Sequence, residues 1–241
     1  FSDLEQQSAN IKQEGKNNAT LIGSTITYIA GLFLLLSFAG PYWIESYPEM
    51  FSPFKHMGLW EYCFDRFRFP EYQYDKYFDG CHYIFGEELY KIREWLLPAW
   101  LMAVQTFVTL ALMLSFTAQI LLACVIIRLP LRMVLRYEWI FVSISFTLVA
   151  LSSFFLFLAV AVFGGNCYRR DFLMYPSFNV VSWSYVFSVI AFILFGNNLK
   201  TKLELKYLVV NLLFIYIFFC VLLYFLVFKY LVVNLVKKNY T

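Results

Sequence analysis

The sequence predicts an α-helical integral membrane protein that carries a small antiparallel β-sheet outside the cell. Of 241 residues, 61% are hydrophobic and only 15% are charged, which leaves too few charges to cover the surface of a soluble domain of this length. Apolar runs recur along the chain at about the 20 residues that a helix needs to cross a bilayer. One polar, aromatic-rich segment, residues 42–95, interrupts these runs.

Four membrane spans are expected from the apolar runs, at residues 20–41, 97–127, 140–164 and 178–196. Runs of this length must be helical, because the bilayer core holds no water to satisfy backbone polar groups. The first run is too long for a signal-peptide hydrophobic region and lacks a small-residue cleavage site, so we expect it to be retained. Since the sequence starts at Phe1 rather than Met, we expect the true start to lie upstream.

The distribution of Lys and Arg among the short loops predicts the orientation, because positive charges favour the cytoplasmic side. The link between the second and third spans, residues 128–139, holds three arginines and a single glutamate. Lysines also precede the first span and follow the fourth. We therefore expect the N-terminal tail, residues 1–19, and this link in the cytoplasm. The first outer loop, residues 42–95, and the second, residues 165–177, then face outward.

The first outer loop is expected to form a small sheet. Aromatic and polar residues alternate in "YCFDRFRF" and "YQYDKYF", and this period of two is typical of strands. More than fifty residues of loop without secondary structure would be unusual. The loop has ten acidic and six basic residues, which gives it a net charge of −4.

Two cysteines of this loop, Cys63 and Cys81, are expected to form a disulfide, because cysteines in one compact extracellular loop normally pair. Such a bond contributes about 3 kcal/mol in the chain-entropy model. By count, a zinc site is the alternative, with ligands His56, Cys63, Cys81 and His82. Their spacing matches no compact ligand pattern, and an oxidising compartment disfavours thiolate ligands. Cys167, in the second outer loop, is the odd cysteine, so a free thiol and an intermolecular bond both stay open.

The outer segment resembles the W…GLW…C…C signature of the claudin superfamily's first extracellular segment. The matching residues are Trp43, Gly58, Leu59, Trp60 and the two cysteines, with Arg93 at the basic position that claudin-type proteins usually have before the second span. The resemblance covers roughly residues 20–196 and implies a left-handed four-helix bundle whose outer loops form an antiparallel sheet. The wide gap between the cysteines and the many Phe and Tyr resemble divergent invertebrate claudins of septate junctions.

As the resemblance implies, we expect a multi-pass plasma-membrane protein at lateral cell–cell junctions, where it contributes to adhesion and the paracellular barrier. The expected partners are the lipid bilayer, claudin-like proteins in cis and in trans, and cytoplasmic junction scaffolds, with no cofactor and no nucleic acid. The alternative is an auxiliary subunit of an ion channel, of the calcium-channel gamma or glutamate-receptor regulatory type. A third class, a tetraspan of the peripheral myelin type, predicts a shorter outer loop.

No enzymatic activity is expected, because the sequence has no phosphate loop, no nucleophile elbow and no HExxH pattern. The spans carry few ionisable groups of the kind that mark a proton or substrate path. Four polar residues of the second span are interpreted as interhelical hydrogen-bonding groups: Gln105, Ser115, Thr117 and Gln119.

Three acidic residues of the outer loop are candidates for charge selectivity, because related claudins line paracellular pores with this segment: Asp65, Asp75 and Asp79. The alternative is that these carboxylates solvate the sheet or pair with neighbouring basic residues. Trp43 and Trp60 also have a second interpretation, as members of an interfacial aromatic belt.

Residues 197–241 depart from the resemblance, since a claudin is expected to enter a polar tail here. The segment stays apolar, and the heptapeptide KYLVVNL occurs twice, at 206–212 and 229–235. One interpretation is an extra C-terminal hydrophobic helix, with a fifth span at 207–228. The other is a gene-model artefact or alternative terminus, because AT-rich noncoding sequence translates into Phe, Tyr, Leu, Lys and Asn. Both interpretations stay open.

Overall fold

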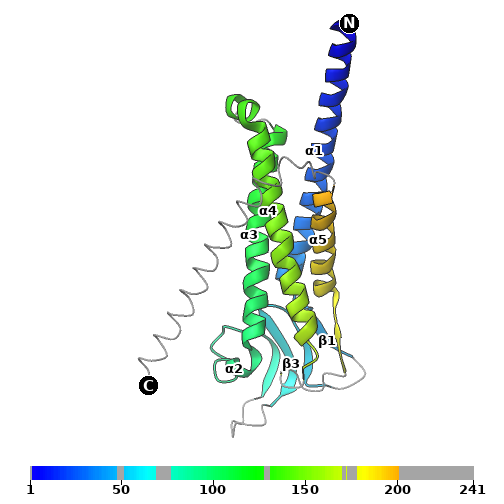
Figure 1. Cartoon of the computed structure of the whole chain (residues 1–241). Coiled ribbons are helices and arrows are strands. Elements are labelled where there is room, and N and C mark those ends of the chain that lie inside the picture. The colour runs from blue at the N-terminus through cyan, green and yellow to red at the C-terminus, as the bar shows by residue number, and fades with distance from the viewer. Residues whose placement is uncertain are drawn as a thin grey trace.

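The computed structural model describes residues 2–47, 52–68, 77–127, 131–169, 172 and 178–200. Within these ranges, four long helices run side by side (Figure 1): α1 (Ser2–Ala39), α3 (Ala99–Ile127), α4 (Leu131–Asn166) and α5 (Trp183–Lys200). A β-sheet and the short helix α2 (Arg93–Leu96) lie at one end of the helices, opposite the N-terminus. We call this part of the molecule the sheet end. Asp75 and the expected fifth span lie outside the described residues.

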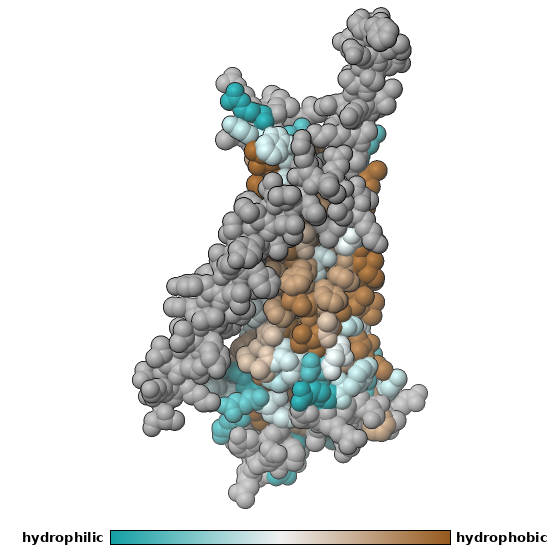
Figure 2. Space-filling view, in the orientation of Figure 1, coloured by the Kyte–Doolittle hydropathy of each residue, from teal (hydrophilic) through white to brown (hydrophobic). Residues whose placement is uncertain are grey.

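Helix packing closes the four helices into a bundle, because α1 contacts α5 and α3, and α4 contacts α5 and α3. Small residues lie fully buried along these contacts, namely Ala30, Ala111, Ala118, Ala159 and Ala191. Small side chains let helix backbones approach closely, which is the usual basis of packing in membranes. Figure 2 shows hydrophobic residues concentrated along the middle of the helices and hydrophilic residues at both ends, many of them at the sheet end.

Three of the described helices contain segments long and apolar enough to cross a membrane, at Thr20–Ala39, Ala99–Ile127 and Arg136–Asn166. The fourth apolar segment, Trp183–Asn197, is shorter. The predicted start of this span, at residue 178, was wrong. The strand β5 (Asn179–Val181) precedes the helix because its backbone pairs with another strand of the sheet.

The two expected cytoplasmic segments are more helical than the sequence predicts. Helix α1 already begins at Ser2, and α4 begins at Leu131, so most of the predicted 128–139 link is helix. Leu, Arg and Met are strong helix formers, which accounts for the early start of α4. The backbone of Tyr137, with φ −120° and ψ 19°, marks a kink between this first part and the span.

The polar residues of α3 have two kinds of partner. Gln119 crosses to α1, where its amide Nε2 donates to Thr27 O at 3.3 Å. Gln105 instead reaches the loop at the sheet end, and Ser115 and Thr117 donate to carbonyls of α3 itself. The interhelical interpretation is therefore confirmed for Gln119 alone among the four.

The sheet has five antiparallel strands in the order β4-β3-β2-β1-β5. Its strands are β1 (Ile44–Ser46), β2 (Phe54–Met57), β3 (Glu61–Phe67), β4 (Phe78–Tyr83) and β5. Strands β1 to β4 come from the first outer loop, and β5 comes from the segment before α5. The pairing of Ile44 with Val181 thus joins the segment before α5 to the segment that follows α1 in one sheet.

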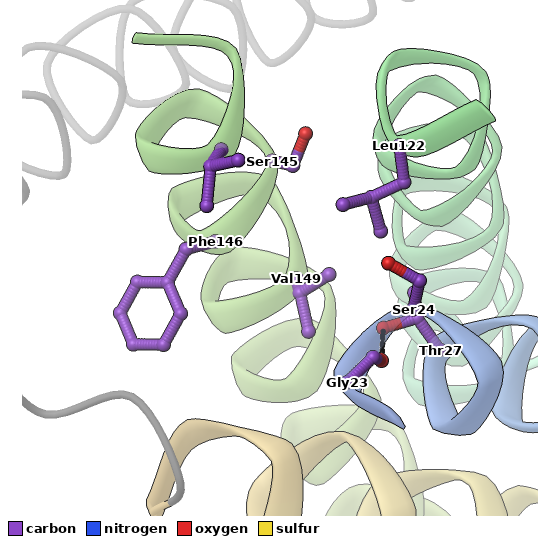
Figure 3. Close-up of a pocket in the computed structure, with 8 residues that line it drawn as sticks. Gly23, Ser24, Thr27, Leu122, Ser145, Phe146 and Val149 are labelled. Atoms are coloured by element: carbon purple, nitrogen blue, oxygen red, sulfur yellow. Dashed lines mark hydrogen bonds between the residues drawn. The ribbon is translucent and has the colours of Figure 1, made fainter. Parts of the chain in front are cut away.

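A small pocket lies between α1, α3 and α4 within the bundle, and Figure 3 shows the side chains that line it. Its hydroxyls already donate one helical turn back, Ser24 to Thr20 O, Thr27 to Gly23 O and Ser145 to Phe141 O. The other lining residues are apolar or glycine. The pocket therefore offers no acid or base for proton transfer.

Candidate functional site

Trp43 lies at the centre of the junction between sheet and bundle. Its side chain is 0% exposed, and its indole Nε1 donates to Ser37 O at 2.9 Å. The ring makes edge contacts with Phe163 of α4 and Tyr185 of α5, with centroids 4.7 and 5.8 Å away. An aromatic-belt residue would expose its ring to lipid, so Trp43 is a core residue of the protein.

The Gly58-Leu59-Trp60 turn packs against the end of α1. A Cβ on Gly58 would lie 2.7 Å from Pro41 Cα and 2.8 Å from Gly40 O, so only glycine fits there without a backbone shift. Leu59 is fully buried. Trp60 is partly buried, and its Nε1 donates to Phe38 O at 3.1 Å.

Arg93 fixes the segment between β4 and α2. Its Nε donates to Ile84 O at 3.2 Å, and its Nη2 donates to Gly86 O at 3.0 Å. The guanidinium carbon also lies 5.9 Å from the ring centroid of Phe85 and 5.3 Å from that of Tyr90. These distances are in the range of cation–π attraction. In these contacts the partners of Arg93 are backbone carbonyls and aromatic rings, so this basic residue before α3 organises the loop that precedes it.

Cys63 and Cys81 form the predicted disulfide. They lie directly opposite one another on the neighbouring strands β3 and β4, so the bond fixes the register of this pair. Cys63 is buried, whereas Cys81 is exposed on the edge strand.

A β-bulge follows the disulfide on β3. The register shifts between Phe64 and Phe67, and Arg66 adopts a φ of 46°. An extra residue in one strand returns the next side chain to the original face. Phe67 therefore stacks on Phe64 at 4.8 Å, and Phe64 stacks on Tyr62 at 5.9 Å. Three residues form one aromatic row on the buried face of the sheet.

Tyr62 anchors this aromatic row to α2. Its hydroxyl donates to Leu96 O at 2.8 Å. Complete burial raises the pKa of Tyr62 well above its ordinary value, because the phenolate would be desolvated. The hydroxyl therefore stays protonated and keeps donating.

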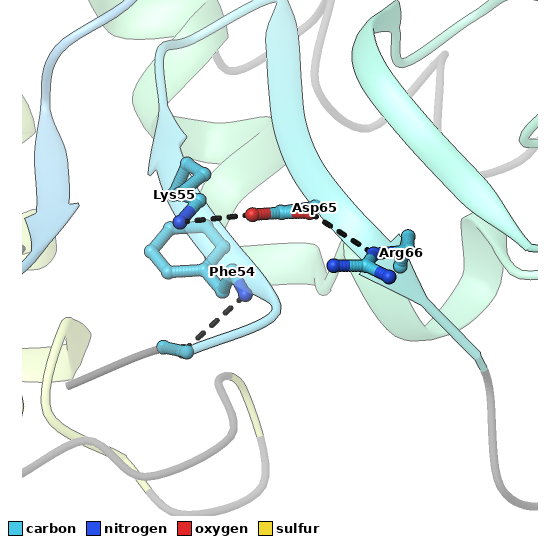
Figure 4. Close-up of polar contacts among 5 residues, drawn as sticks. Phe54, Lys55, Asp65 and Arg66 are labelled. Atoms are coloured by element: carbon cyan, nitrogen blue, oxygen red, sulfur yellow. Dashed lines mark hydrogen bonds and ion pairs between the residues drawn. The ribbon is translucent and has the colours of Figure 1, made fainter.

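The acidic candidates differ in their surroundings. Asp65 forms ion pairs with Lys55 at 3.1 Å and with Arg66 at 3.8 Å, and its side chain is 48% exposed (Figure 4). Asp79 lies exposed on the edge strand β4. The structure does not bring the two carboxylates into one described cluster.

The four residues of the zinc alternative are not gathered into one site. The disulfide occupies both sulfurs. His82 contacts Glu88 Oε2 through Nδ1 at 2.5 Å and Asp79 O through Nε2 at 2.9 Å. Only His56 lies beside the sulfurs, with its ligand atom and theirs within 4.8 Å of one another.

Cys167 is a buried free thiol. Its Sγ lies 3.4 Å from Gly164 O at the end of α4, and the residue is 2% exposed. Burial also raises the pKa of this thiol, which disfavours the reactive thiolate. Of the two alternatives, the structure favours the free thiol over an intermolecular bond.

Two polar contacts at the sheet end carry no distinct sequence signal. Gln105 of α3 donates to Leu59 O at 2.5 Å, and Ser182 donates to Glu45 Oε2 at 2.7 Å. The first ties the bundle to the glycine turn, and the second ties the residue after β5 to β1. Neither pair is close in the sequence, so only the tertiary fold identifies them.

Four packed helices with a disulfide-bonded antiparallel sheet at one end define a multi-pass membrane protein. The family model described as PMP-22/EMP/MP20/Claudin tight junction matches residues 28–196, which is most of the 241-residue chain. The chain therefore belongs to this family, and the predicted superfamily is confirmed. The family is one of non-enzymatic membrane proteins. A search of the curated proteins finds no match.

Proposed function

We propose that this protein is a cell-junction protein that contributes to adhesion and the paracellular barrier. One observation at the sheet end carries the proposal. Large aromatic side chains are exposed there, beyond the apolar helices: Tyr77 at 59%, Tyr83 at 55%, Phe85 at 43% and Tyr90 at 69%. Aromatic residues are enriched at protein–protein interfaces, and clustered exposure of apolar surface marks binding sites.

The proposal sets the sheet end outside the cell. A disulfide persists in an oxidising compartment, and Lys and Arg of the short loops favour the cytoplasmic side at the opposite end. The exposed aromatics would then contact claudin-like proteins in the same membrane and in the facing one. Junction scaffolds would bind on the cytoplasmic side. The wide cysteine spacing supports a septate-junction member of the family.

The location of a tagged full-length protein in a polarised epithelium tests this function. We expect belts along the lateral cell–cell contacts. In a Tyr77→Ser/Tyr83→Ser variant we expect the protein to reach the surface but to leave these belts, because the exposed rings are lost. The matched control is Tyr137→Ser, since Tyr137 is also exposed but lies at the far end of α4. Wild-type protein that clusters with a channel away from junctions would favour the auxiliary-subunit alternative instead.

We further propose that Asp79 affects ion selectivity of the junction more than Asp65. The Lys55 and Arg66 ion pairs already offset the charge of Asp65, whereas Asp79 is exposed at the sheet edge. In a layer expressing Asp79→Asn, we expect a measurable fall in the sodium-to-chloride permeability ratio, of up to about twofold, since salt screens exposed charges.

Asp65→Asn is the comparison variant in the same assay, and we expect it to change the permeability ratio less than Asp79→Asn does. Asp75→Asn is measured as well, because Asp75 is the third candidate for charge selectivity. Equal ratios for Asp79→Asn and wild type, with both proteins present at the junction, would assign Asp79 a solvating role.

A further inference from the structure

Three side chains with metal-binding atoms lie in one row across the sheet. His56 on β2 pairs with Cys63 on β3, and Cys63 pairs with Cys81 on β4. Directly paired residues of neighbouring strands share one face of a sheet. One ligand atom from each residue lies within 4.8 Å of the other two. The strand register therefore holds the three donors together.

The imidazole of His56 is oriented by contacts outside this row. Its Nδ1 lies 3.1 Å from Pro41 O. A carbonyl oxygen only accepts, so Nδ1 is the nitrogen that donates, which leaves Nε2 as the nitrogen through which the neutral ring would bind a metal. The ring also stacks on Tyr42, with centroids 4.1 Å apart and planes inclined by 21°. Histidines that bind metals are oriented in the same way, with the other ring N–H donating to a carbonyl or carboxylate.

The Glu61 carboxylate lies beside one member of the row, Cys63, and would have to move toward the other two donors to act as a fourth ligand. Its Oε1 lies 3.5 Å from Cys63 Sγ. The sulfur carries no proton in the disulfide, so this is a contact and not a hydrogen bond. Two thiolates, an imidazole and a carboxylate are all ligands that zinc accepts in a tetrahedral site. In the oxidised protein, the bond between the sulfurs prevents them from acting as thiolate ligands.

We propose that reduction of the Cys63–Cys81 disulfide converts this row into a binding site for Zn²⁺. The expected ligands are His56, Cys63, Cys81 and Glu61. Two molecules of a small-molecule thiol reduce the disulfide and leave as one disulfide of their own, which gives two cysteine thiols. Zinc then displaces both thiol protons into solvent. Zn–S bonds of about 2.3 Å place the two thiolates about 3.8 Å apart, a separation within reach of paired residues on adjacent strands.

A metal ion can reach the proposed site from the edge of the sheet, and its binding would stabilise the pairing of β3 with β4. Cys81 is exposed on the edge strand, so reductant and zinc reach the row from the edge, whereas His56 is half-buried and Cys63 is buried. A metal that bridges β3 and β4 at the position of the disulfide keeps the same register when the covalent bond is absent. In the reduced protein, bound zinc would therefore keep β3 and β4 paired in the same register.

Metal binding to the full-length protein in detergent micelles tests the inference. The protein is reduced under argon with a phosphine, desalted and titrated with Co²⁺, which reports thiolate ligands by a charge-transfer absorption, and then with Zn²⁺. We expect one metal bound per reduced chain and no such band in the oxidised chain. His56→Ala is expected to weaken zinc binding at least tenfold. His82→Ala removes the other outer histidine and is expected to leave the affinity unchanged.

Three results would overturn the proposal. The first is no charge-transfer band in the reduced wild type. The second is equal affinity for wild type and for His56→Gln, a variant of similar size whose disulfide is verified before reduction to exclude a folding defect. The third is a full band in Cys63→Ser/Cys81→Ser, because metal would then be bound by the remaining thiols.

Discussion

Replacing Trp43 with Ala is expected to lower the free energy of unfolding by about 3–5 kcal/mol, in the range measured for large aromatic core truncations. Trp43 is fully buried, and its ring contacts Phe163 and Tyr185 on two different helices. The substitution also removes the hydrogen bond to Ser37 O. The sheet end would lose the side chain that packs it onto the bundle.

Thermal unfolding of the purified protein in detergent, followed by tryptophan fluorescence, measures this effect. Trp43→Phe is expected to cost less than Trp43→Ala, because it keeps a ring in the pocket and loses mainly the indole hydrogen bond. Trp139→Ala is the matched control, since Trp139 is 57% exposed on α4, and we expect its effect to stay below about 1 kcal/mol. Equal effects of the two alanine variants would contradict a core role for Trp43.

The length of the apolar runs was sufficient to predict the long apolar helices, because the bilayer allows only helices for such runs. The same reasoning failed at residues 178–182. This segment is as apolar as the helix that follows it, yet residues 179–181 pair with β1 and form a strand. The partner strand lies more than a hundred residues earlier in the chain, so no local pattern reveals the pairing.

The alternating aromatic residues predicted strands between Tyr62 and Phe67, and the structure has β3 there. The bulge at Arg66 is not visible in the pattern, because it depends on the pairing of β3 with β4. Without the bulge, Phe67 would face away from Tyr62 and Phe64. The positive φ of Arg66 is therefore a result of packing the third ring onto the same face.

The pairing of the two cysteines was predictable from the compartment and their shared loop, but the orientation of His56 was not. Its proton is fixed by Pro41 O, and its ring plane by Tyr42. Both residues belong to the chain between α1 and β1, which reaches β2 only in the folded protein. Sequence reasoning counted His56 and His82 as equivalent ligands, and the structure separates them.

Removing the disulfide is expected to have the second large effect. Cys63→Ser/Cys81→Ser eliminates a cross-link between residues separated by 18 positions, which contributes about 3 kcal/mol through the entropy of the unfolded chain. The edge strand β4 depends on this bond more than the inner strands do, because within the described part of the chain it pairs on one side only, with β3. We expect the variant to unfold at lower temperature and to be retained in the secretory pathway.

Mass spectrometry of non-reduced peptides first establishes the bond in wild type, and both thiols found free would contradict it. Thermal unfolding and surface labelling then compare the double variant with Cys124→Ser. Cys124 is a free cysteine of α3, so its replacement removes a thiol without removing a cross-link, and we expect stability within about 1 kcal/mol of wild type. If the double variant were as stable as Cys124→Ser, the aromatic row of Tyr62, Phe64 and Phe67 would hold β3 and β4 in register without the disulfide. We expect a loss of stability instead, because the described residues include no second strand beside β4 whose pairing could replace the missing bond.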